Sequence, residues 1–547
     1  MKKYSLWFII ILAFILRFYR LGDYPALNAD EAAIGYNAYS LLQTGRDEHG
    51  NSWPTHFQSF NDYKPGLYFY LVLPFVKFFG LNEWAVRIPG AILGVLTVFI
   101  VYLLTNKLFS DQKFKIWNLE FGIWPAFLLA ISPWHIHFSR GGWEVNVATF
   151  FIVCGVWLYL KFLKNSTLLF FSFLFFSLSL YSYHAARIVT PLLLLGILVI
   201  YRDVVRHNLK HFLLAGLVGL IVLTPLLKEL SGPAGISRAA GVGLFADSGP
   251  ILRINESRGE HADYKSLQAV LLHNKAINFG LSFLENWTEH FHGEFLFVSG
   301  DEIQRNKVPE TGQMYLFDIL LLALGLVALA RNFSRQWILI FWWLIVAPTA
   351  AALTFQSPHA LRAQNMVIPL VIISALGLFS LISWIDQNVK RKSLLFTFYF
   401  LLFTFSGQNF ARYLHMYWVH MAKEYPFSSQ YGVKELVQYT EKNQDKYEKI
   451  IVTGRYDQPY ILFLFYLKYP PEIFQKEHVL TQKDDYGFST VRNFSKYYFQ
   501  PIVFDEIRPA NPNTLIAGTD KEIPEYANVI EKIYGKNGYL YFEVVAN

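Results

Sequence analysis

The chain has 547 residues, of which 53% are hydrophobic and 16% charged. Its mean hydropathy is +0.27. A soluble globular protein carries about 25% charged residues, so this composition excludes a disordered chain and argues against an ordinary soluble enzyme. The single cysteine, Cys154, excludes an intramolecular disulfide and a cysteine-rich metal cluster. The net charge of +7 is divided among short clusters between apolar runs, which fits the loops of a membrane protein better than a nucleic-acid site.

Apolar runs predict a mainly α, polytopic membrane protein with about eleven transmembrane helices, since one span needs about 20 apolar residues. The predicted spans are 5–21, 86–104, 117–132, 145–162, 168–183, 188–201, 211–228, 313–331, 336–354, 363–385 and 393–409. The stretch Gly66–Phe79 is marginally long, contains Pro74 and carries Lys77. We expect it to form a helix that lies at the interface or re-enters it, with a full span as the alternative.

Lysine and arginine predict the orientation, because cytoplasmic loops are enriched in both. With Lys2 and Lys3 inside, alternate loops are short and basic. They carry Lys107, Lys113 and Lys115, then Lys161 and Lys164, then Arg202, Arg206 and Lys210, then Arg331 and Arg335, and finally Lys390, Arg391 and Lys392. The first run ends in charged residues without a small-residue cleavage site, so we interpret it as a span rather than a signal peptide. The sequence therefore predicts a multi-pass protein of the plasma or inner membrane, with its N-terminus in the cytoplasm.

All long polar segments then lie outside, and they suggest two domains. We expect a membrane domain over residues 1–409, with long outer loops at 22–65 and 229–312, and an extracytoplasmic α/β domain over 410–547. The tail predicts helices at 431–443 and 459–469 and strands at 449–453, 502–504, 514–517, 529–534 and 539–545. Gly535-Lys536-Asn537-Gly538 separates the last two strands and is typical of a hairpin turn.

Candidate catalytic groups stand in the first outer loop. Asp30 and Glu31 are adjacent acids just after the first span. Such a pair can be a solvated helix N-terminus, where acids favour the helix dipole, or a costly functional pair near the membrane. Lys64, in Asn-Asp-Tyr-Lys-Pro-Gly, precedes the interfacial helix. It could contact lipid headgroups without specificity, or grip a phosphate at the interface.

From here the sequence resembles the GT-C membrane glycosyltransferases, in the branch with the protein O-mannosyltransferases and the lipid A aminoarabinose transferases. The acidic pair, the Lys-Pro-aromatic stretch and four longer segments carry the likeness, which extends over nearly all of residues 1–385. The segments are WAVRIPGAILGVLTVFIVYLL (84–104), SPWHIHFSRGGWEVNVATFF (132–151), GEFLFVSGDEIQRNKVPETGQMYLFDILLLALG (293–325) and SPHALRAQNMVIPLVI (357–372).

The resemblance implies transfer of a sugar from a polyprenyl-phosphate carrier, on the outer face, to a lipid, glycan or protein hydroxyl, typically with inversion. Asp30 matches the first-loop catalytic acid of this family, and Lys64 matches the carrier-phosphate lysine of the aminoarabinose branch. That branch has a metal-binding Glu directly before its lysine, whereas this chain has Tyr63 there and Asp62 one residue earlier. A divalent metal stays open as a cofactor.

Further charged residues at predicted outer helix ends are weaker candidates. Glu144 is a second catalytic acid by a loose alignment, and Arg140 could orient a carboxylate or bind phosphate. Arg187 and Arg362 could face the carrier phosphate, although an interfacial anchor is the simpler explanation of each. In Glu-His-Phe-His-Gly-Glu (289–294), His290 and His292 alternate with carboxylates and could bind a transition metal, but this loop lacks a placed third ligand and is more simply a polar loop. Asp62, beside Lys64, is a separate weak candidate for a metal ligand.

Other functions lack their motifs or leave different traces. We find no Walker A loop, no dinucleotide-binding glycine pattern and no Asp-x-Asp triplet of the kind that holds a nucleotide sugar. A transporter or flippase of lipid-linked sugars is the main alternative, but transporters favour inverted repeats and intramembrane charges, which the sequence does not show. A scaffold with an external sensing domain is a third hypothesis. Sugar and acceptor are not identified by the sequence.

Overall fold

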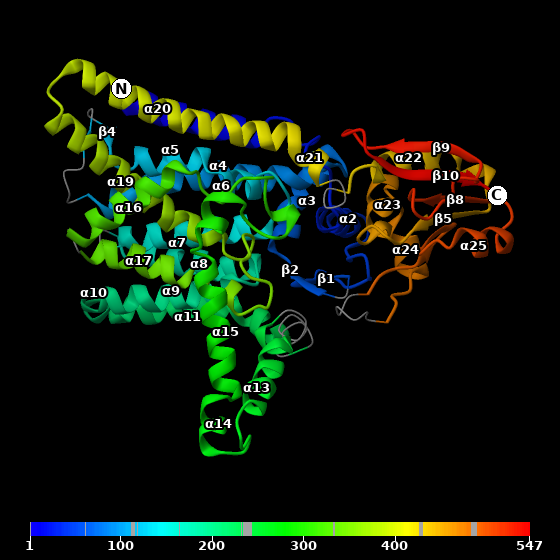
Figure 1. The fold of residues 1–547 in the computed structure, drawn as a ribbon, viewed down its shortest axis with the longest axis horizontal. Helices are drawn as coiled ribbons and strands as arrows, with labels where there is room; N and C mark the ends of the chain where they lie inside the picture. The colour runs from blue at the N-terminus through cyan, green and yellow to red at the C-terminus, as the bar shows by residue number, and fades with distance from the viewer. Residues whose placement is uncertain are drawn as a thin grey trace. The chain divides into compact units, whose positions relative to one another are not determined.

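The computed structural model describes residues 2–60, 62–110, 115–116, 119–162, 165–230, 232, 243–331, 334–425, 430–482 and 489–547 (Figure 1). The chain divides into two compact units. Unit 1 contains residues 1–17, 90–139 and 143–416, and unit 2 contains residues 18–89, 140–142 and 417–547. The predicted boundary at residue 410 separates a membrane domain from an extracytoplasmic domain, and it stays a prediction. In the packing of the chain, the predicted first outer loop belongs to the same compact unit as the tail.

Unit 1 is a bundle of apolar helices. Its helices, two of which extend into unit 2, are α1 (Lys2–Phe18), α4 (Glu83–Leu108), α5 (Ile123–Ile131), α6 (Pro133–Ser139), α7 (Glu144–Phe162), α8 (Thr167–Ser182), α9 (Ala186–Ile200), α10 (Arg202–His207), α11 (Leu209–Leu230), α13 (Gly249–Gly259), α14 (Leu267–Leu272), α15 (Lys275–Glu289), α16 (Phe317–Arg331), α17 (Arg335–Val346), α18 (Thr349–Ala352), α19 (Val367–Asn388) and α20 (Lys392–His415). Each of the eleven predicted runs contains a helix.

Within the described residues, six helical segments are long and apolar enough to cross a membrane, and four further apolar helices are shorter. The run at 117–132 is helical only from Ile123, because residues Leu119–Glu120 form strand β4, which pairs with β3 (Lys115–Ile116). Close packing uses glycine where backbones meet. A Cβ atom on Gly377 of α19 would lie 1.8 Å from the carbonyl oxygen of Leu321 in α16, so these two helices touch directly.

Buried polar groups in unit 1 satisfy helix ends. Arg17 of α1 is fully buried and donates hydrogen bonds to the carbonyl oxygens of Leu129 and Ala130, at 3.3 and 3.1 Å. These carbonyls belong to the last turn of α5, where a helix runs out of N–H partners, although the Leu129 carbonyl also accepts from the Ser132 N–H at 3.3 Å. Arg17 also donates to Nδ1 of His135 at 2.7 Å. The arginine at the end of the first predicted span is therefore a C-terminal cap for α5.

Unit 2 combines the first outer loop with a mixed sheet from the tail. The loop forms α2 (Ala29–Thr44), β1 (His56–Ser59), β2 (Asp62–Pro65) and α3 (Leu67–Phe79). The tail forms α21 (Met421–Glu424), α22 (Val433–Asn443), β5 (Lys449–Thr453), α23 (Pro459–Leu467), α24 (Pro471–Glu477), β6 (Asn493–Phe494), β7 (Tyr497–Gln500), α25 (Phe504–Ala510), β8 (Thr514–Gly518), β9 (Val529–Tyr534) and β10 (Leu540–Ala546). The strand order is β6-β7-β5-β8-β10-β9, with β5 parallel to β7 and β8.

Most of the predicted tail elements are confirmed, including the hairpin of β9 and β10. The predicted strand at 502–504 is wrong, because α25 begins at Phe504. Asp505 and Glu506 occupy the first turn of α25, where acids interact favourably with the helix dipole. Ile502 and Phe504 still reach the core, where they pack with sheet residues such as Ile451. The apolar pattern at 502–504 therefore reports burial rather than strand pairing.

Candidate active site

The acidic pair of the first outer loop begins helix α2. Asn28 is the N-cap residue, and its side chain accepts a hydrogen bond from the Glu31 N–H at 3.0 Å. In turn, the Glu31 carboxylate accepts a hydrogen bond from the Asn28 N–H at 3.3 Å. This reciprocal capping box fixes the first turn, which carries Asp30 between the two partners.

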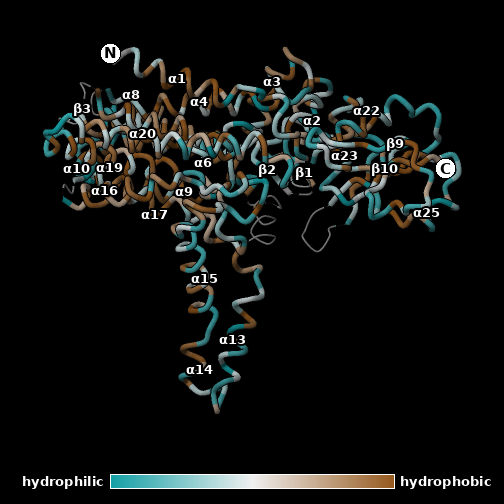
Figure 2. Tube along the Cα trace, turned by 45° about the horizontal axis from the view of Figure 1, so that its top comes forward, coloured by the Kyte–Doolittle hydropathy of each residue, from teal (hydrophilic) through white to brown (hydrophobic). Residues whose placement is uncertain are grey.

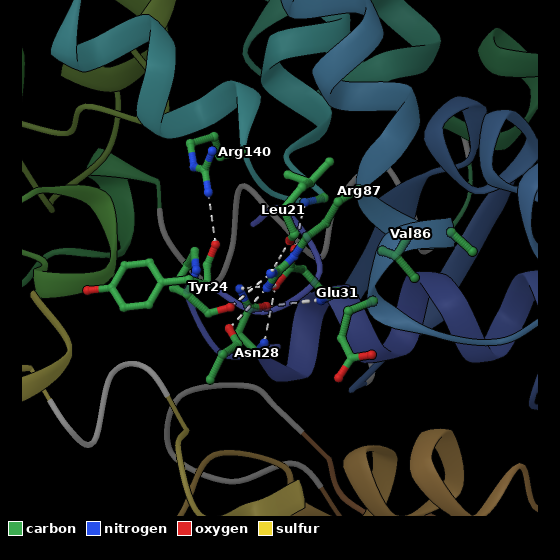
Figure 3. A network of polar contacts seen from close by, with 12 residues as sticks. Leu21, Tyr24, Asn28, Glu31, Val86, Arg87 and Arg140 are labelled. Atoms are coloured by element: carbon green, nitrogen blue, oxygen red, sulfur yellow. Dashed lines mark hydrogen bonds and ion pairs between the residues drawn. The ribbon is translucent and has the colours of Figure 1, made fainter. Parts of the chain in front are cut away.

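Glu31 and Arg87 form a buried ion pair inside unit 2 (Figure 3). The Arg87 Nε and Nη2 atoms donate to the two carboxylate oxygens, each at 2.7 Å. The same guanidinium donates to the carbonyl oxygens of Leu21, Pro25 and Ala26 at 2.8–3.1 Å. Glu31 also accepts from the Gly142 N–H at 2.9 Å. These contacts tie the loop before α2 to Arg87 of α4.

Replacement of Arg87 with alanine should strongly destabilise the protein. It leaves Glu31 buried without its cation, and breaking a buried ion pair in this way typically costs about 3–5 kcal/mol. Chemical unfolding in detergent, followed by tryptophan fluorescence, measures this loss. The double variant Arg87→Met, Glu31→Leu removes both charges and should recover part of it. A loss below about 1 kcal/mol for Arg87→Ala would contradict the prediction, since surface ion pairs contribute only that much.

Asp30 points to a different partner, the Lys64 ammonium on β2, with which it forms an ion pair. The two side chains are 27% and 13% exposed, so both are partly shielded but reachable from solvent. The hairpin of β1 and β2 places Lys64 opposite Phe57, and its Nζ lies 5.5 Å from the centre of the Phe60 ring. A carboxylate and an ammonium that stand 34 residues apart in sequence are therefore brought together.

The tail holds α2 along its length. The Gln430 side chain accepts from the Ala29 N–H at 2.6 Å and donates to the Asp457 carbonyl at 2.6 Å. Further along, the Gln475 amide donates to Ser40 Oγ and to the Asp47 carbonyl, at 3.1 and 2.8 Å. Because Asp30 directly follows Ala29, these bonds fix the backbone of the candidate catalytic acid.

Sequence reasoning missed two buried acids in this loop, Asp47 and Glu48, of which Glu48 lies near Lys64. The Glu48 side chain is fully buried, and Oε1 accepts from Asn37 Nδ2 at 3.1 Å. Burial raises the pKa of Glu48 to about 8, while nearby Lys64 opposes this shift. In the sequence, Arg46-Asp47-Glu48-His49-Gly50 is typical of an exposed polar turn. Only the fold shows that Glu48 faces the interior near Lys64.

Arg140 also belongs to unit 2 and is 1% exposed. Its guanidinium donates to the carbonyl oxygens of Tyr19 and Tyr24, at 2.8 and 3.3 Å, and to the Tyr417 hydroxyl at 2.9 Å. It lies 4.8 Å from the centre of the Trp418 ring. Arg140 therefore braces the backbone before α2, and Figure 3 shows it donating to Tyr24.

The remaining charged candidates lie in unit 1. Glu144 begins α7 and is 8% exposed. Arg187 lies in the first turn of α9 and donates to His184 Nδ1 at 3.0 Å. Arg362 donates to Thr354 Oγ1 at 2.6 Å. Arg362 stands in a loop that Asp301 fixes, since the buried Asp301 carboxylate accepts from the Ala360 N–H at 2.6 Å.

The candidate metal ligands do not form a described site. His290 donates from Nδ1 to the Asn286 carbonyl at 2.7 Å and accepts at Nε2 from the His359 N–H at 3.1 Å. Both ring nitrogens are thus used, and burial lowers the pKa of His290 to about 4. The side chain of Asp62 lies outside the described residues. Among the residues that the structure describes, no group of three or more His, Cys, Asp or Glu, with His292 included, could hold a metal ion.

Comparison with known proteins relates one segment of the chain to a family. Residues 63–228 match the family described as dolichyl-phosphate-mannose-protein mannosyltransferase. This segment is therefore similar to a family of GT-C mannosyltransferases. The matched range includes Lys64, Arg87, Arg140, Glu144 and Arg187. No curated protein matches the sequence.

The fold of the chain is similar to that of ArnT from Cupriavidus metallidurans. The structure of ArnT in the apo state has a TM-score of 0.55 and 11% identity, with 99% of this chain and 97% of ArnT covered. The structure bound to undecaprenyl phosphate has a TM-score of 0.54 and 11% identity, with 98% and 97% covered. The predicted GT-C fold with a small C-terminal sheet domain is therefore confirmed, and the chain is a multi-pass membrane protein like ArnT.

Proposed function

We propose that the enzyme transfers a sugar from a polyprenyl-phosphate carrier to a hydroxyl group of a lipid, glycan or protein on the outer face of the membrane, with inversion at the anomeric carbon. The pairing of Asp30 with Lys64 is the observation that carries this proposal. The structural likeness to ArnT, which has been determined with undecaprenyl phosphate, supports the class of donor.

Asp30 is the proposed general base. The acceptor oxygen attacks the anomeric carbon, and the bond from that carbon to the phosphate oxygen breaks with its electrons leaving on the phosphate. The hydroxyl proton passes to the Asp30 carboxylate as the new bond forms. Glu144 is the second candidate acid. Glu31 has a different proposed role, because its oxygens already accept from Arg87 and Gly142. It positions the first turn of α2.

Lys64 is the proposed carrier-phosphate ligand. The departing polyprenyl phosphate gains negative charge in the transition state, and a fixed ammonium in a partly dehydrated site stabilises that charge. The Asp30 carboxylate holds Lys64 in place before the donor binds. Arg187 and Arg362 are further proposed phosphate ligands. Arg140 instead supports the loop before α2, through its bonds to Tyr19 and Tyr24.

Purified protein incubated with a panel of polyprenyl-phosphate sugars tests the proposed function. Mass spectrometry of the lipid pool should show free polyprenyl phosphate appearing with one sugar in the presence of an acceptor. The same preparation carrying Asp30→Asn should leave the panel unchanged. Consumption of a nucleotide sugar, with all lipid-linked donors intact, would overturn the proposed donor class.

The proposed outer-face reaction also predicts a topology. The alternating basic loops support an extracytoplasmic C-terminus. Alkaline phosphatase fused after Asn547 should be active in a bacterial host, since this reporter folds only outside the cytoplasm. A green fluorescent protein fused at the same position is the matched control and should be dark after export in an unfolded state. The reverse pattern would place the tail and the candidate site on the inner side.

A further inference from the structure

A helical hairpin projects from unit 1, and no role in the reaction explains it. This arm, residues 249–289, consists of α13, α14 and α15. The two long helices pack on each other, with Ile254 and Phe279 buried, and the Arg258 Nε atom donates to the His273 carbonyl at 2.7 Å. Figure 1 shows the arm running across the direction of α7, α16 and α19. If these helices cross the membrane, the arm lies along its surface.

The outward face of α15 is apolar over Ile277, Leu281 and Leu284 and becomes polar at Glu285 and Thr288, near the end of the helix. Ile277, Leu281 and Leu284 are 38%, 58% and 55% exposed, and their i, i+4, i+7 spacing places them in one stripe. The adjoining helix α14 continues this character at the tip, where Leu267 and Leu271 are 75% and 57% exposed. Figure 2 shows the hydrophobic segments along α15 and α14. An exposed stripe of this kind marks an interaction surface.

The outward face of α13 is different. Arg253, Asn255 and Glu256 are exposed there, and Leu252 is the apolar exception. The hairpin as a whole therefore has one polar helix and one apolar helix. In Figure 1, α15 lies on the side of the arm toward the α10 end of the bundle, and α13 lies on the other side. The apolar helix thus lies on the side of the arm that is nearer to the α10 end of the bundle.

The base of the arm is held rigidly against the bundle. The Trp287 Nε1 atom donates to the Ile345 carbonyl at 3.0 Å, and the Asn286 amide donates to the Thr354 carbonyl at 2.9 Å. Because these bonds join α15 to residues around α17 and α18, the arm keeps one orientation to the spans. An amphipathic element held perpendicular to membrane-spanning helices runs parallel to the bilayer surface, where its apolar face can contact lipid.

We propose that the arm is an interfacial membrane anchor. It lies flat on the bilayer, with the stripe of Ile277, Leu281 and Leu284 inserted at the boundary between headgroups and acyl chains, and with α13 in water. Amphipathic helices bind membranes in this way, with their apolar face buried by about 5–10 Å. The proposal depends on the chain spanning a membrane and not on the roles given to Asp30 and Lys64.

Site-directed labelling of the full-length protein in lipid nanodiscs tests this placement. The only native cysteine, Cys154, is replaced with alanine, and an environment-sensitive NBD dye is attached at Leu281→Cys on α15. The matched control carries the dye at Asn255→Cys on α13, which is equally part of the arm. The dye at 281 should emit at shorter wavelength than at 255, and lipids brominated high in the acyl chain should quench it several-fold more strongly.

The same measurement at Leu284→Cys guards against a local effect of one substitution, and circular dichroism shows whether each variant is folded. Two outcomes would overturn the proposal. Equal emission and no bromolipid quenching at 281, 284 and 255 would place α15 in water. A blue shift at 281 without bromolipid quenching, accompanied by dimers in the nanodisc, would instead identify a second copy of the chain as the occupant of this face.

Discussion

Asp30→Asn should lower turnover by roughly 100-fold or more and leave donor binding intact, because general-base catalysis contributes about 10²–10⁴-fold. Asparagine keeps the shape of the side chain and can still contact Lys64, but it cannot accept the hydroxyl proton. Single-turnover transfer from a polyprenyl-phosphate sugar gives the rate, and titration of the donor gives its affinity. The two measurements separate loss of a base from loss of a phosphate ligand.

Two other acids are the controls for this assignment. Glu31→Gln alters the ion pair with Arg87, so its main effect should be on the midpoint of unfolding. Glu144→Gln tests the second acid. If either variant loses 100-fold in rate while remaining folded, and Asp30→Asn keeps nearly normal turnover, the base is that residue and not Asp30.

The fold explains why Asp30 rather than Glu31 is available for chemistry. The two acids are neighbours in sequence and sit in the same helical turn, yet their surroundings differ. Glu31 is 2% exposed and accepts from Arg87, Asn28 and Gly142, whereas Asp30 is 27% exposed and meets Lys64. One acid thereby fixes the turn that presents the other to solvent. Residue spacing alone cannot separate these roles, since Arg87 and Gly142 are distant in sequence.

Periodicity and charge predicted much of the fold because both are local signals. Apolar runs found a helix in each of eleven places, and strand β5 was predicted with its observed bounds. The errors arose where tertiary contacts decide the outcome. The pattern at 502–504 is buried without pairing, and Glu48 is enclosed although its neighbours are polar. Long-range packing, which one sequence does not display, determined both.

The same limit applies to the tail, whose contribution to the site is visible only in the fold. Gln430 contacts the first residue of α2 from 401 positions away. A residue of this type in a polar segment carries no functional signal by itself. Its bond to Ala29 nevertheless sets the backbone from which Asp30 extends. The tail thereby has a physical connection to the proposed general base, although none of its residues is a proposed catalytic group.

Lys64→Ala should weaken use of the donor by about 10- to 100-fold, because a hydrogen bond to a charged group typically contributes about 1.5–3 kcal/mol. The loss should fall mainly on donor affinity and on the rate at low donor concentration, unlike that of Asp30→Asn. Lys64→Arg should restore only part of it, since a planar guanidinium does not reproduce the compact ammonium held between Asp30 and the Phe60 ring.

Lys77→Ala is the matched control for Lys64→Ala. Lys77 is exposed in the last turn of α3, thirteen residues after Lys64. Its replacement with alanine removes the same charge from the same predicted outer segment. If nonspecific attraction to the membrane surface explains the effect, both variants should lose donor affinity equally. Both losses should then become smaller as the salt concentration is raised. A fixed phosphate ligand predicts a large loss for Lys64→Ala and little change for Lys77→Ala. Unchanged donor affinity in a folded Lys64→Ala protein would remove this lysine from the site, because no other step of the proposed mechanism needs its charge.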